Sequence, residues 1–461
     1  MGAVGILGSL LLGESNSVEV RVHIDPNRVL GQTPDNFLGF GYEISSVAVK
    51  GLLARKNHTL LQYYRNLGKE GVVRIGGNTA DFASWSPEGQ AVSAPKATVI
   101  NRSVLADLGE FLHAIGWKLI WNLNLGSGSA ESAAEEAIAV AAAAEDRLLC
   151  FQIGNEPDLF ARSGHRAESY GYPEYHREFA RFVSVLRKRL PDVPIGGPDV
   201  ARAMQWASWF AADEAQSIKL LTAHYYRASQ RQPAANFDSL LHADPQFLSR
   251  IRELRAVSRR YQVPYRLTEV NSFSGGGKPG LSDTFASALW ALDLLFTLSF
   301  YEAAGLNLET GINQLGFVSS YSPIFDDQRG NLTARPSYYA MLAFSMAGLG
   351  KRIHTDIISK GMNVTAYASV DKWSRTWITC INKEIVNDVH VLLSCESRFK
   401  SAKAMRLTAP SFDAKTGTTL AEAEVSPEGF WKPKHLEKLK HNRRQIILDL
   451  PRSSAALIQL I

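Results

Sequence analysis

The stretch Leu148-Leu149-Cys150-Phe151-Gln152-Ile153-Gly154-Asn155-Glu156-Pro157 decides how the rest of the chain is interpreted. It begins as a continuous apolar run, which is typical of a strand buried on both faces. Because proline cannot continue a central strand, the strand is expected to stop there, with Glu156 at its tip. An acid in this position indicates a functional carboxylate, and the structural alternative is a loop acid that caps the next helix.

A second stretch repeats the pattern. Tyr265-Arg266-Leu267-Thr268-Glu269-Val270-Asn271 is expected to be a short strand with Glu269 at its C-terminal end. Glu156 and Glu269 are 113 residues apart, which leaves room for roughly three strand–helix units. Two carboxylates at one end of a parallel sheet suit glycoside hydrolysis. One is protonated and donates to the leaving oxygen, while the other is ionised and attacks the anomeric carbon.

Strands and helices alternate over residues 35–348. Eight strands, each followed by a helix, predict an α/β fold of the (β/α)₈ barrel type, with its site at the C-terminal ends of the strands. The strands are expected at Phe37–Glu43, Val72–Gly76, Lys118–Leu125, the run from Leu148, Ile195–Pro198, Lys219–Tyr226, Tyr265–Asn271 and Ile312–Val318.

The pattern changes after Gly350, where short strands and turns replace the helices. Residues 349–461 are therefore expected to form a β-sandwich, completed by an alternating strand in the segment 17–34. The strands are expected at Val364–Val370, Thr376–Ile381, Val389–Leu393, Ala404–Leu407 and Ile446–Leu450.

Several of these motifs resemble a known family. Asn155-Glu156-Pro157, followed by an acid about three units later, resembles clan A glycoside hydrolases. Within that clan, Arg74-Ile75-Gly76-Gly77-Asn78-Thr79-Ala80-Asp81 and Gly41-Tyr42-Glu43 resemble glycoside hydrolase family 79, which contains exo-acting β-glucuronidases and heparanases. The resemblance runs from about Val18 to the C-terminus and implies that Glu156 is the acid/base and Glu269 the nucleophile.

The expected chemistry is a retaining double displacement. Glu269 forms a glycosyl-enzyme, while Glu156 protonates the leaving oxygen and then deprotonates water. This mechanism predicts carboxyl groups about 5–5.5 Å apart. Arg74 and Tyr226 are expected to hold Glu269 ionised through charge and hydrogen bonding, and the resemblance supports Tyr226 in this role.

Other polar residues at the strand ends are expected to bind the sugar. The resemblance implies that Asn155 holds the 2-hydroxyl and that Glu43 and Asn78 contact other hydroxyls. The structural alternative for each is a loop cap. His224 is expected to donate a hydrogen bond from behind the site rather than to ligate a metal.

A uronic acid requires a partner for its carboxylate, and an arginine would be the obvious one. None is evident at the end of the expected eighth strand. The resemblance points to the loop Ser319-Ser320-Tyr321-Ser322-Pro323 instead. It implies that the Tyr321 hydroxyl and the adjacent amides, including that of Ser320, receive the carboxylate. The alternative is that Tyr321 packs at the barrel rim.

Composition sets wider limits. The 461 residues carry a net charge of +5 and are 45% hydrophobic, as in an ordinary globular protein. The positive charge fits an anionic substrate only weakly. The basic clusters Arg250–Arg260 and Lys432–Arg444 are interpreted as solvated faces, so no nucleic-acid partner is expected. No metal-ligand spacing is present, and no cofactor is expected. Cys380 and Cys395 could pair across strands.

The N-terminal residues 1–13 are apolar, lack basic residues and are too short to span a bilayer. They could be the remnant of a secretory signal, which favours a secreted or periplasmic protein with no membrane contact.

The sequence therefore predicts a retaining exo-β-glucuronidase acting on glucuronic acid-containing carbohydrates or glycoconjugates. One alternative is a heparanase-like endo-β-glucuronidase that cuts glycosaminoglycans. Another is a clan A enzyme for a neutral sugar, which would not need the carboxylate-binding loop. An alternative of a different class is a non-catalytic carbohydrate-binding protein built on a dead barrel.

Overall fold

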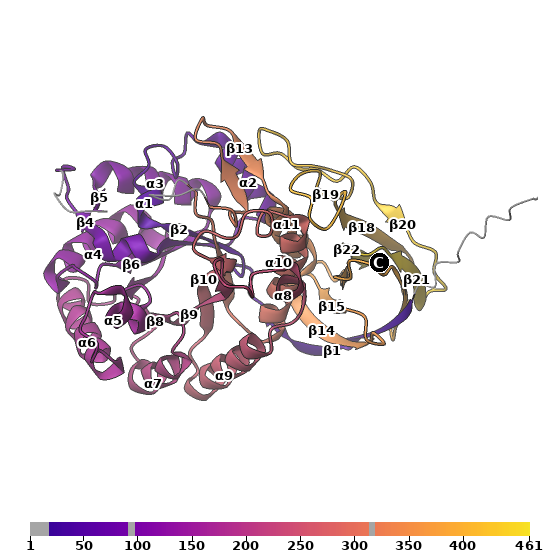
Figure 1. Ribbon diagram of the computed structural model, residues 1–461, viewed down its shortest axis with the longest axis horizontal. Coiled ribbons are helices and arrows are strands. Elements are labelled where there is room, and N and C mark those ends of the chain that lie inside the picture. Colours follow the sequence, from indigo (N-terminus) through magenta and orange to yellow (C-terminus); the bar gives the residue numbers. More distant parts are fainter. Residues whose placement is uncertain (1–17, 91–96, 313–318) are drawn as a thin grey trace, which may run out of the picture.

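A computed structural model describes residues 18–90, 97–312 and 319–461. The chain forms two parts that lie side by side in Figure 1. Strands alternate with helices in the first part, and the second part consists of strands from the C-terminal region together with β1 (Val18–Thr33).

The first part is a barrel of eight parallel strands in the order β7-β6-β3-β2-β11-β10-β9-β8. A parallel bridge between Phe151 and Ile195 joins the two ends of this order. The strands are β2 (Gly39–Glu43), β3 (Val72–Gly76), β6 (Lys118–Leu123), β7 (Leu148–Ile153), β8 (Gly196–Val200), β9 (Leu220–Ser229), β10 (Tyr265–Ser274) and β11 (Gly305–Glu309).

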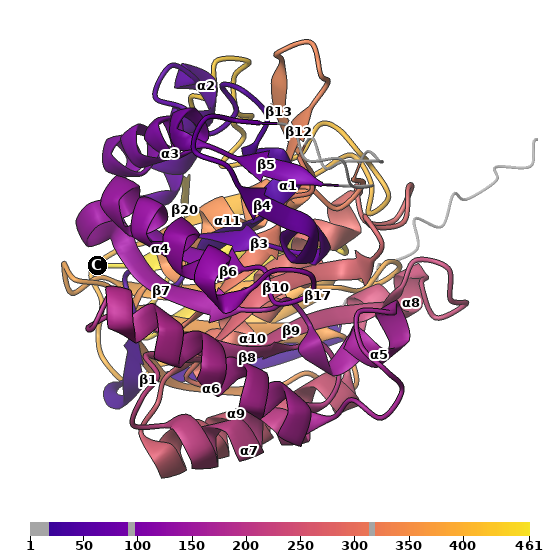
Figure 2. The same ribbon diagram turned by 90° about the vertical axis from the view of Figure 1, so that its left-hand side faces the viewer.

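A helix follows each barrel strand, and α4, α6, α7 and α9 lie outside the strands in Figure 2. Polar side chains cap several of these helices, as expected for exposed N-termini. Asn101, for example, accepts from the amide of Val104. The helices are α1 (Ile44–Val47), α2 (His58–Leu67), α3 (Arg102–Ile115), α4 (Ala130–Ala144), α5 (Phe160–Ser163), α6 (Tyr172–Arg189), α7 (Met204–Glu214), α8 (Phe237–Leu241), α9 (Pro245–Tyr261), α10 (Phe285–Phe300) and α11 (Pro336–Ala347).

The eighth strand differs from the prediction. It is Gly305–Glu309, not Ile312–Val318, and residues 313–318 of the predicted strand lie outside the described residues. Gly305–Glu309 alternates leucines with Asn307 and Glu309, so it lacks the apolar run by which buried parallel strands were identified. The seventh strand was also predicted too short, because β10 continues to Ser274 and Glu269 lies near its middle.

The second part confirms the predicted accessory β-sheet domain. Its strands form one ladder in the order β19-β18-β22-β16-β15-β14-β1-β17-β21, and β20 pairs with β18. The apolar side chains of these strands form a core of their own. The strands are β14 (Gly350–Ile358), β15 (Val364–Val370), β16 (Thr376–Asn382), β17 (Val389–Cys395), β18 (Ala402–Thr408), β19 (Thr419–Leu420), β20 (Glu437–Lys438), β21 (Gln445–Leu450) and β22 (Ser454–Leu460).

β1 lies inside this ladder, antiparallel to β14 and parallel to β17. We propose domain boundaries at 35–348 for the barrel and at 17–34 with 349–461 for the sheet domain. Helix α10 joins the domains through Asp293, which bonds Lys383 Nζ at 2.6 Å and Thr365 Oγ1 at 2.6 Å. Cys380 and Cys395 are buried free thiols, so they do not pair.

Two short strand pairs lie in the barrel loops. β4 (Ala83–Trp85) pairs in parallel with β5 (Thr98–Ile100). β12 (Ile324–Asp326) pairs antiparallel with β13 (Leu332–Ala334). Over the described residues, none of the helices combines the length and the hydropathy needed to cross a bilayer.

Candidate active site

The two predicted catalytic glutamates lie together at the C-terminal end of the barrel. Glu156 follows β7, and Glu269 lies in β10. One carboxylate oxygen of each, together with a ring nitrogen of His224, lies within 4.8 Å of the others. This short separation favours the spacing of retaining enzymes over the wider gap of about 6.5–9.5 Å that an inverting enzyme needs for its water.

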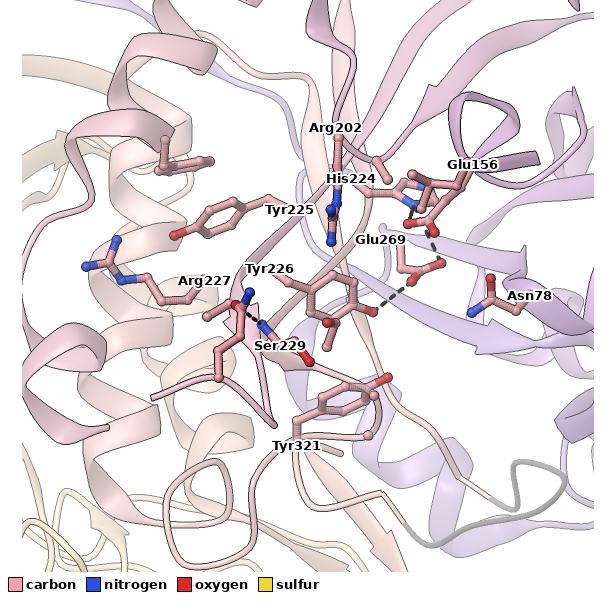
Figure 3. Close-up of a pocket in the computed structure, with 18 of the residues that line it drawn as sticks. Asn78, Glu156, Arg202, His224, Tyr225, Tyr226, Arg227, Ser229, Glu269 and Tyr321 are labelled. Carbon is pink, nitrogen blue, oxygen red and sulfur yellow. Dashed lines mark hydrogen bonds and ion pairs between the residues drawn. The ribbon is translucent and has the colours of Figure 1, made fainter. Parts of the chain in front are cut away.

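Glu269 is held from two sides. Arg74 Nη1 donates to Oε2 at 2.8 Å. The Tyr226 hydroxyl donates to Oε1 at 2.7 Å (Figure 3). Both donors fix the position and orientation of the Glu269 carboxyl group. Arg74 and Tyr226 therefore lie where the sequence placed them, beside the proposed nucleophile.

Glu156 has a different environment. Burial raises its pKa, and the bond from His224 Nδ1, 2.9 Å from Oε1, opposes this shift. Its backbone lies in the left-handed region, with φ of 50°, which costs a non-glycine residue some strain. The site thus contains one acid that accepts from two strong donors and a second whose burial favours the protonated form, as the proton donor of a general acid/base pair requires.

Asp199 was missed in the sequence, although it is the penultimate residue of the short strand β8 and is fully buried. Oδ2 accepts from Arg74 Nη2 at 2.7 Å, and Oδ1 lies 2.9 Å from His224 Nε2. Burial alone would raise its pKa, but His224 and Arg74 hold it well below the ordinary value. The predicted fifth strand ended at Pro198, two residues before the end of β8, so Asp199 was not considered as a strand-end residue.

The sugar-binding candidates form a group around Arg74. Asn155 Oδ1 accepts from Arg74 Nη2 at 2.7 Å, and its Nδ2 lies 3.4 Å from Asn78 Oδ1. Glu43 accepts from the amides of Asn78 and Thr79 and from the Thr79 hydroxyl at 2.6 Å. Burial, followed by the charge of Glu269, raises the pKa of Glu43 to about 7.

Glu309 at the end of β11 is a second acid that the sequence analysis missed, because the eighth strand was misplaced. Among the described residues, neither of its carboxyl oxygens has a hydrogen-bond partner. Burial and the charges of Glu269 and Glu43 raise its pKa well above the ordinary value. Gly41 faces it, and a Cβ there would lie 2.5 Å from Glu309 Oε2.

The predicted carboxylate-binding loop lies beside the pocket. The buried Tyr321 ring stacks on Tyr226, with ring centroids 6.1 Å apart (Figure 3). The amides of Ser320 and Tyr321 both donate to the Gly276 carbonyl, at 2.6 and 3.3 Å. In this conformation the Tyr321 ring faces the pocket, whereas these two amides are already engaged.

These side chains line a pocket of about 450 Å³. The inner part of this pocket is lined by Glu43, Asn78, Glu269 and Tyr321. In Figure 3, Tyr226 lies between Glu269 and the side chains of Tyr225 and Arg227, which belong to the outer part. The outer part is formed by the ends of β8 and β9 and by the start of α9. Its residues include Arg202, Tyr225, Arg227, Asp244, Phe247 and Arg250.

Glu156, His224 and Glu269 also form the one set of acidic and histidine side chains, within the described segments, that is close enough to surround a metal ion. Their atoms are engaged with one another, and Arg74 lies 2.8 Å from Glu269. A buried cation in this position competes with a metal for the carboxylate. The set is better explained as an acid/base pair with its positioning residues.

No family model matches the chain, but similar sequences are found among curated proteins. A β-glucuronidase of Aspergillus niger is 26% identical over 402 residues, which cover 74% of this chain and 73% of that protein. A β-glucuronidase of Neurospora crassa is 22% identical and covers 70% of this chain and 65% of that protein. Rat heparanase is 25% identical over 205 residues, 42% of this chain and 36% of that protein.

Among solved structures, a 4-O-α-L-rhamnosyl-β-D-glucuronidase of Fusarium oxysporum superposes with a TM-score of 0.74 at 17% identity. The match covers 96% of this chain and all of that one. A family 51 arabinofuranosidase of Xanthomonas axonopodis superposes with a TM-score of 0.68 at 14% identity, over 96% of this chain and all of that one. At these identities the likeness concerns the fold alone.

The barrel and its accessory sheet domain have the fold of these solved glycosidases, and the similarity to the two β-glucuronidases identifies the chain as a glycoside hydrolase. Within this class it resembles the β-glucuronidases and heparanases of family 79, as its motifs predicted.

Proposed function

We propose that the chain is a retaining exo-β-glucuronidase. The observation that carries this proposal is the short separation of Glu156 and Glu269, each with a partner suited to a different protonation state. The similarity to the Aspergillus and Neurospora β-glucuronidases supports the choice of sugar.

In the first step, Glu269 attacks the anomeric carbon while Glu156 gives its proton to the leaving oxygen. The C–O bond to the leaving group breaks as the bond to the Glu269 carboxylate forms. In the second step, Glu156, now ionised, takes a proton from water, and the water oxygen displaces Glu269. The proton balance closes, because Glu156 regains the proton that it gave away.

Asn155, Asn78 and Glu43 would bind the sugar hydroxyls, since they line or border the inner part of the pocket. The Tyr321 hydroxyl would receive the uronate carboxylate. For the amides of Ser320 and Tyr321 to join it, the Gly276 carbonyl would first have to release them. The substrate would be a glucuronic acid-containing carbohydrate or glycoconjugate, and the protein would be secreted or periplasmic.

The test is hydrolysis of 4-nitrophenyl β-glucuronide beside the matching β-glucoside and β-xyloside. We expect cleavage of the glucuronide, and we expect Glu269→Gln to lose it. In Glu156→Ala, added azide should restore turnover and give a β-glycosyl azide, because azide displaces Glu269 from the α-linked glycosyl-enzyme without needing a general base. In Tyr321→Phe, we expect KM for the glucuronide to rise roughly tenfold, since one hydrogen bond to a charged group is lost.

Cleavage of a neutral glycoside in place of the glucuronide would refute the role of Tyr321. Cleavage that survives both glutamate substitutions would refute the mechanism. If glycan binding without any cleavage were found, the chain would be a binding protein on a dead barrel.

A second candidate is a heparanase-like endo-β-glucuronidase that cuts glycosaminoglycans, and the similarity to a rat protein named heparanase supports it. The outer part of the pocket favours it, because no ion pair to Arg202 or Arg250 is found within the described segments, whereas Arg227 is paired with Asp244 at 2.7 Å. Two free guanidinium groups beside the acid/base would suit a sulfated chain. Release of internal fragments from heparan sulfate, faster than release of terminal glucuronate, would establish this alternative.

A further inference from the structure

One side chain touches the partners of both proposed catalytic acids. Asp199 Oδ2 accepts from Arg74 Nη2 at 2.7 Å, and the same guanidinium reaches Glu269 at 2.8 Å. Asp199 Oδ1 lies 2.9 Å from His224 Nε2, and the opposite ring nitrogen lies 2.9 Å from Glu156. The backbone adds a third contact, because the Glu156 amide donates to the Asp199 carbonyl at 3.0 Å.

The surroundings fix this carboxylate in place. The Thr268 hydroxyl donates to Oδ1 at 2.6 Å, Gln152 Nε2 donates to the same oxygen, and Asn122 Nδ2 donates to Oδ2 at 3.2 Å. The Asp199 amide donates to the Thr222 hydroxyl at 3.1 Å. Its φ of 61° lies in the left-handed region, so the chain keeps a strained backbone to aim this side chain.

We propose that Asp199 is a positioning residue that couples the two catalytic glutamates, with one carboxylate oxygen fixing Arg74 against Glu269 and the other fixing His224 against Glu156. The inference rests on the proposed retaining mechanism and goes beyond it, because it gives the two acids a common support. Asp199 itself does not line the pocket and does not touch the substrate.

The charged groups around Asp199 determine the effect of removing its carboxylate charge. His224 faces three acids, namely Asp199, Glu156 and Glu269, and these raise its pKa against the effect of burial. Asp199 faces the cations Arg74 and His224, with Cys150 and Asp81 beyond them. Without the Asp199 charge, His224 releases its proton more easily, and Glu156 loses the cation that stabilises its carboxylate.

The experiment compares Asp199→Asn with the wild type on two substrates. Phenyl β-glucuronide needs the proton from Glu156, whereas 2,4-dinitrophenyl β-glucuronide leaves without it and reports on Glu269 alone. We expect kcat/KM to fall on the order of 100-fold or more on both substrates, because both acids lose a fixed partner. A fall on phenyl β-glucuronide alone would overturn the coupling, because it would leave Asp199 serving Glu156 only.

The pH profile separates positioning from simple packing. The alkaline limb of kcat/KM for phenyl β-glucuronide reports loss of the Glu156 proton, and in Asp199→Asn we expect it to move to higher pH by about one unit. The matched control is Thr222→Val, which removes the bond to the Asp199 amide and keeps the carboxylate. An unmoved limb in Asp199→Asn, or an equal shift in Thr222→Val, would refute the proposal.

A third measurement does not depend on activity. Ring ¹⁵N chemical shifts of His224, assigned with His224→Asn, give the protonation of the imidazole across pH in the full chain. We expect His224 to stay protonated to higher pH in the wild type than in Asp199→Asn. Equal titration in the two folded proteins would overturn the proposal, whereas failure of the wild type to cleave glucuronides would contradict only the function proposed above.

Discussion

Two arginines are completely buried inside the barrel, and they lie at opposite ends of it. Arg74 is near the C-terminal ends of the strands and contacts two carboxylates, those of Asp199 and Glu269. Arg266 is near the N-terminal ends, where it donates to the carbonyls of Asn36, Phe37, Ala304 and Leu306 and to Asn307 Oδ1. No carboxylate contacts Arg266 within the described segments.

The two environments shift the pKa of the arginine side chain in opposite directions. Burial lowers the pKa of Arg266 to about 9. Burial acts on Arg74 in the same sense, but the charges of Asp199 and Glu269 outweigh it and raise the pKa. One end of the barrel therefore uses a buried cation to tie strands together with neutral acceptors, and the other uses it to fix acids that do chemistry.

Arg74→Lys should have the largest effect. A lysine keeps the charge but cannot reach Glu269, Asn155 and Asp199 at once, because it lacks the planar fork of donors. We expect kcat/KM on a β-glucuronide to fall on the order of 1000-fold, with KM less affected than kcat. Circular dichroism should show a folded protein, and a variant with near-wild-type activity would show that the three contacts are not needed together.

Arg266→Met should lower the stability of the fold and leave the activity almost unchanged. The five neutral acceptors around the guanidinium would lose this donor, and each buried acceptor left unsatisfied costs about 1–3 kcal/mol of unfolding free energy. Activity per folded molecule should stay within about twofold, since Arg266 contacts no site residue in this structure. Chemical denaturation would measure the stability, and active-site titration would give the activity per folded molecule. A stability equal to that of the wild type would remove the contrast between Arg266 and Arg74.

The sequence predicted the part of the site that follows a simple rule, a polar residue after an apolar run. Glu156 obeys it by following β7. Glu269 and Tyr226 were found by the same rule, although β10 and β9 continue beyond them, and the structure brings all three together with Arg74 and His224. The rule fails for residues that interrupt a strand from within. Glu309 and Asn307 point polar groups into the barrel, so the eighth strand did not look apolar.

The sheet domain shows a related limit of strand prediction from the sequence. β15, β16 and β21 were predicted within one residue of their ends, because they are compact apolar segments. β14 and β22 were not predicted. β14 begins directly after the glycine-rich end of α11, and its register is set by pairing with β1, more than 300 residues earlier in the chain. Pairing over such distances leaves no local signal.

Glu136 on α4 tests whether a buried charge without an ionic partner is always costly. Burial raises its pKa to about 7, although Trp121 Nε1 donates to it at 2.9 Å. A raised acid pKa stabilises the fold fully below the unfolded value of 4.5, and this contribution is lost as pH rises through about 7. Glu136→Gln should therefore equal the wild type near pH 4.5 and be more stable by roughly 1–3 kcal/mol at pH 8.

Denaturation curves at the two pH values would measure this difference. A gain that is the same at both values would point to packing and not to ionisation of the Glu136 carboxyl.

Arg375→Met should have the smallest effect and serves as the surface counterpart of both buried arginines. Arg375 pairs with Asp371 at 2.7 Å and lies over the exposed ring of Trp373. Its side chain is 37% exposed, so water screens the pair. We expect a loss below about 1 kcal/mol and unchanged kinetics. A loss as large as that of Arg266→Met would show that burial does not explain the contrast.

The position of β1 has a consequence for synthesis. Its neighbours β14 and β17 are translated about 300 residues or more after it, with the whole barrel in between. At typical elongation rates, β1 waits roughly 15–60 seconds on the ribosome with both edges unpaired. A nascent chain of this kind offers an early target for chaperones. A permuted gene that encodes β1 after β22 would remove the wait.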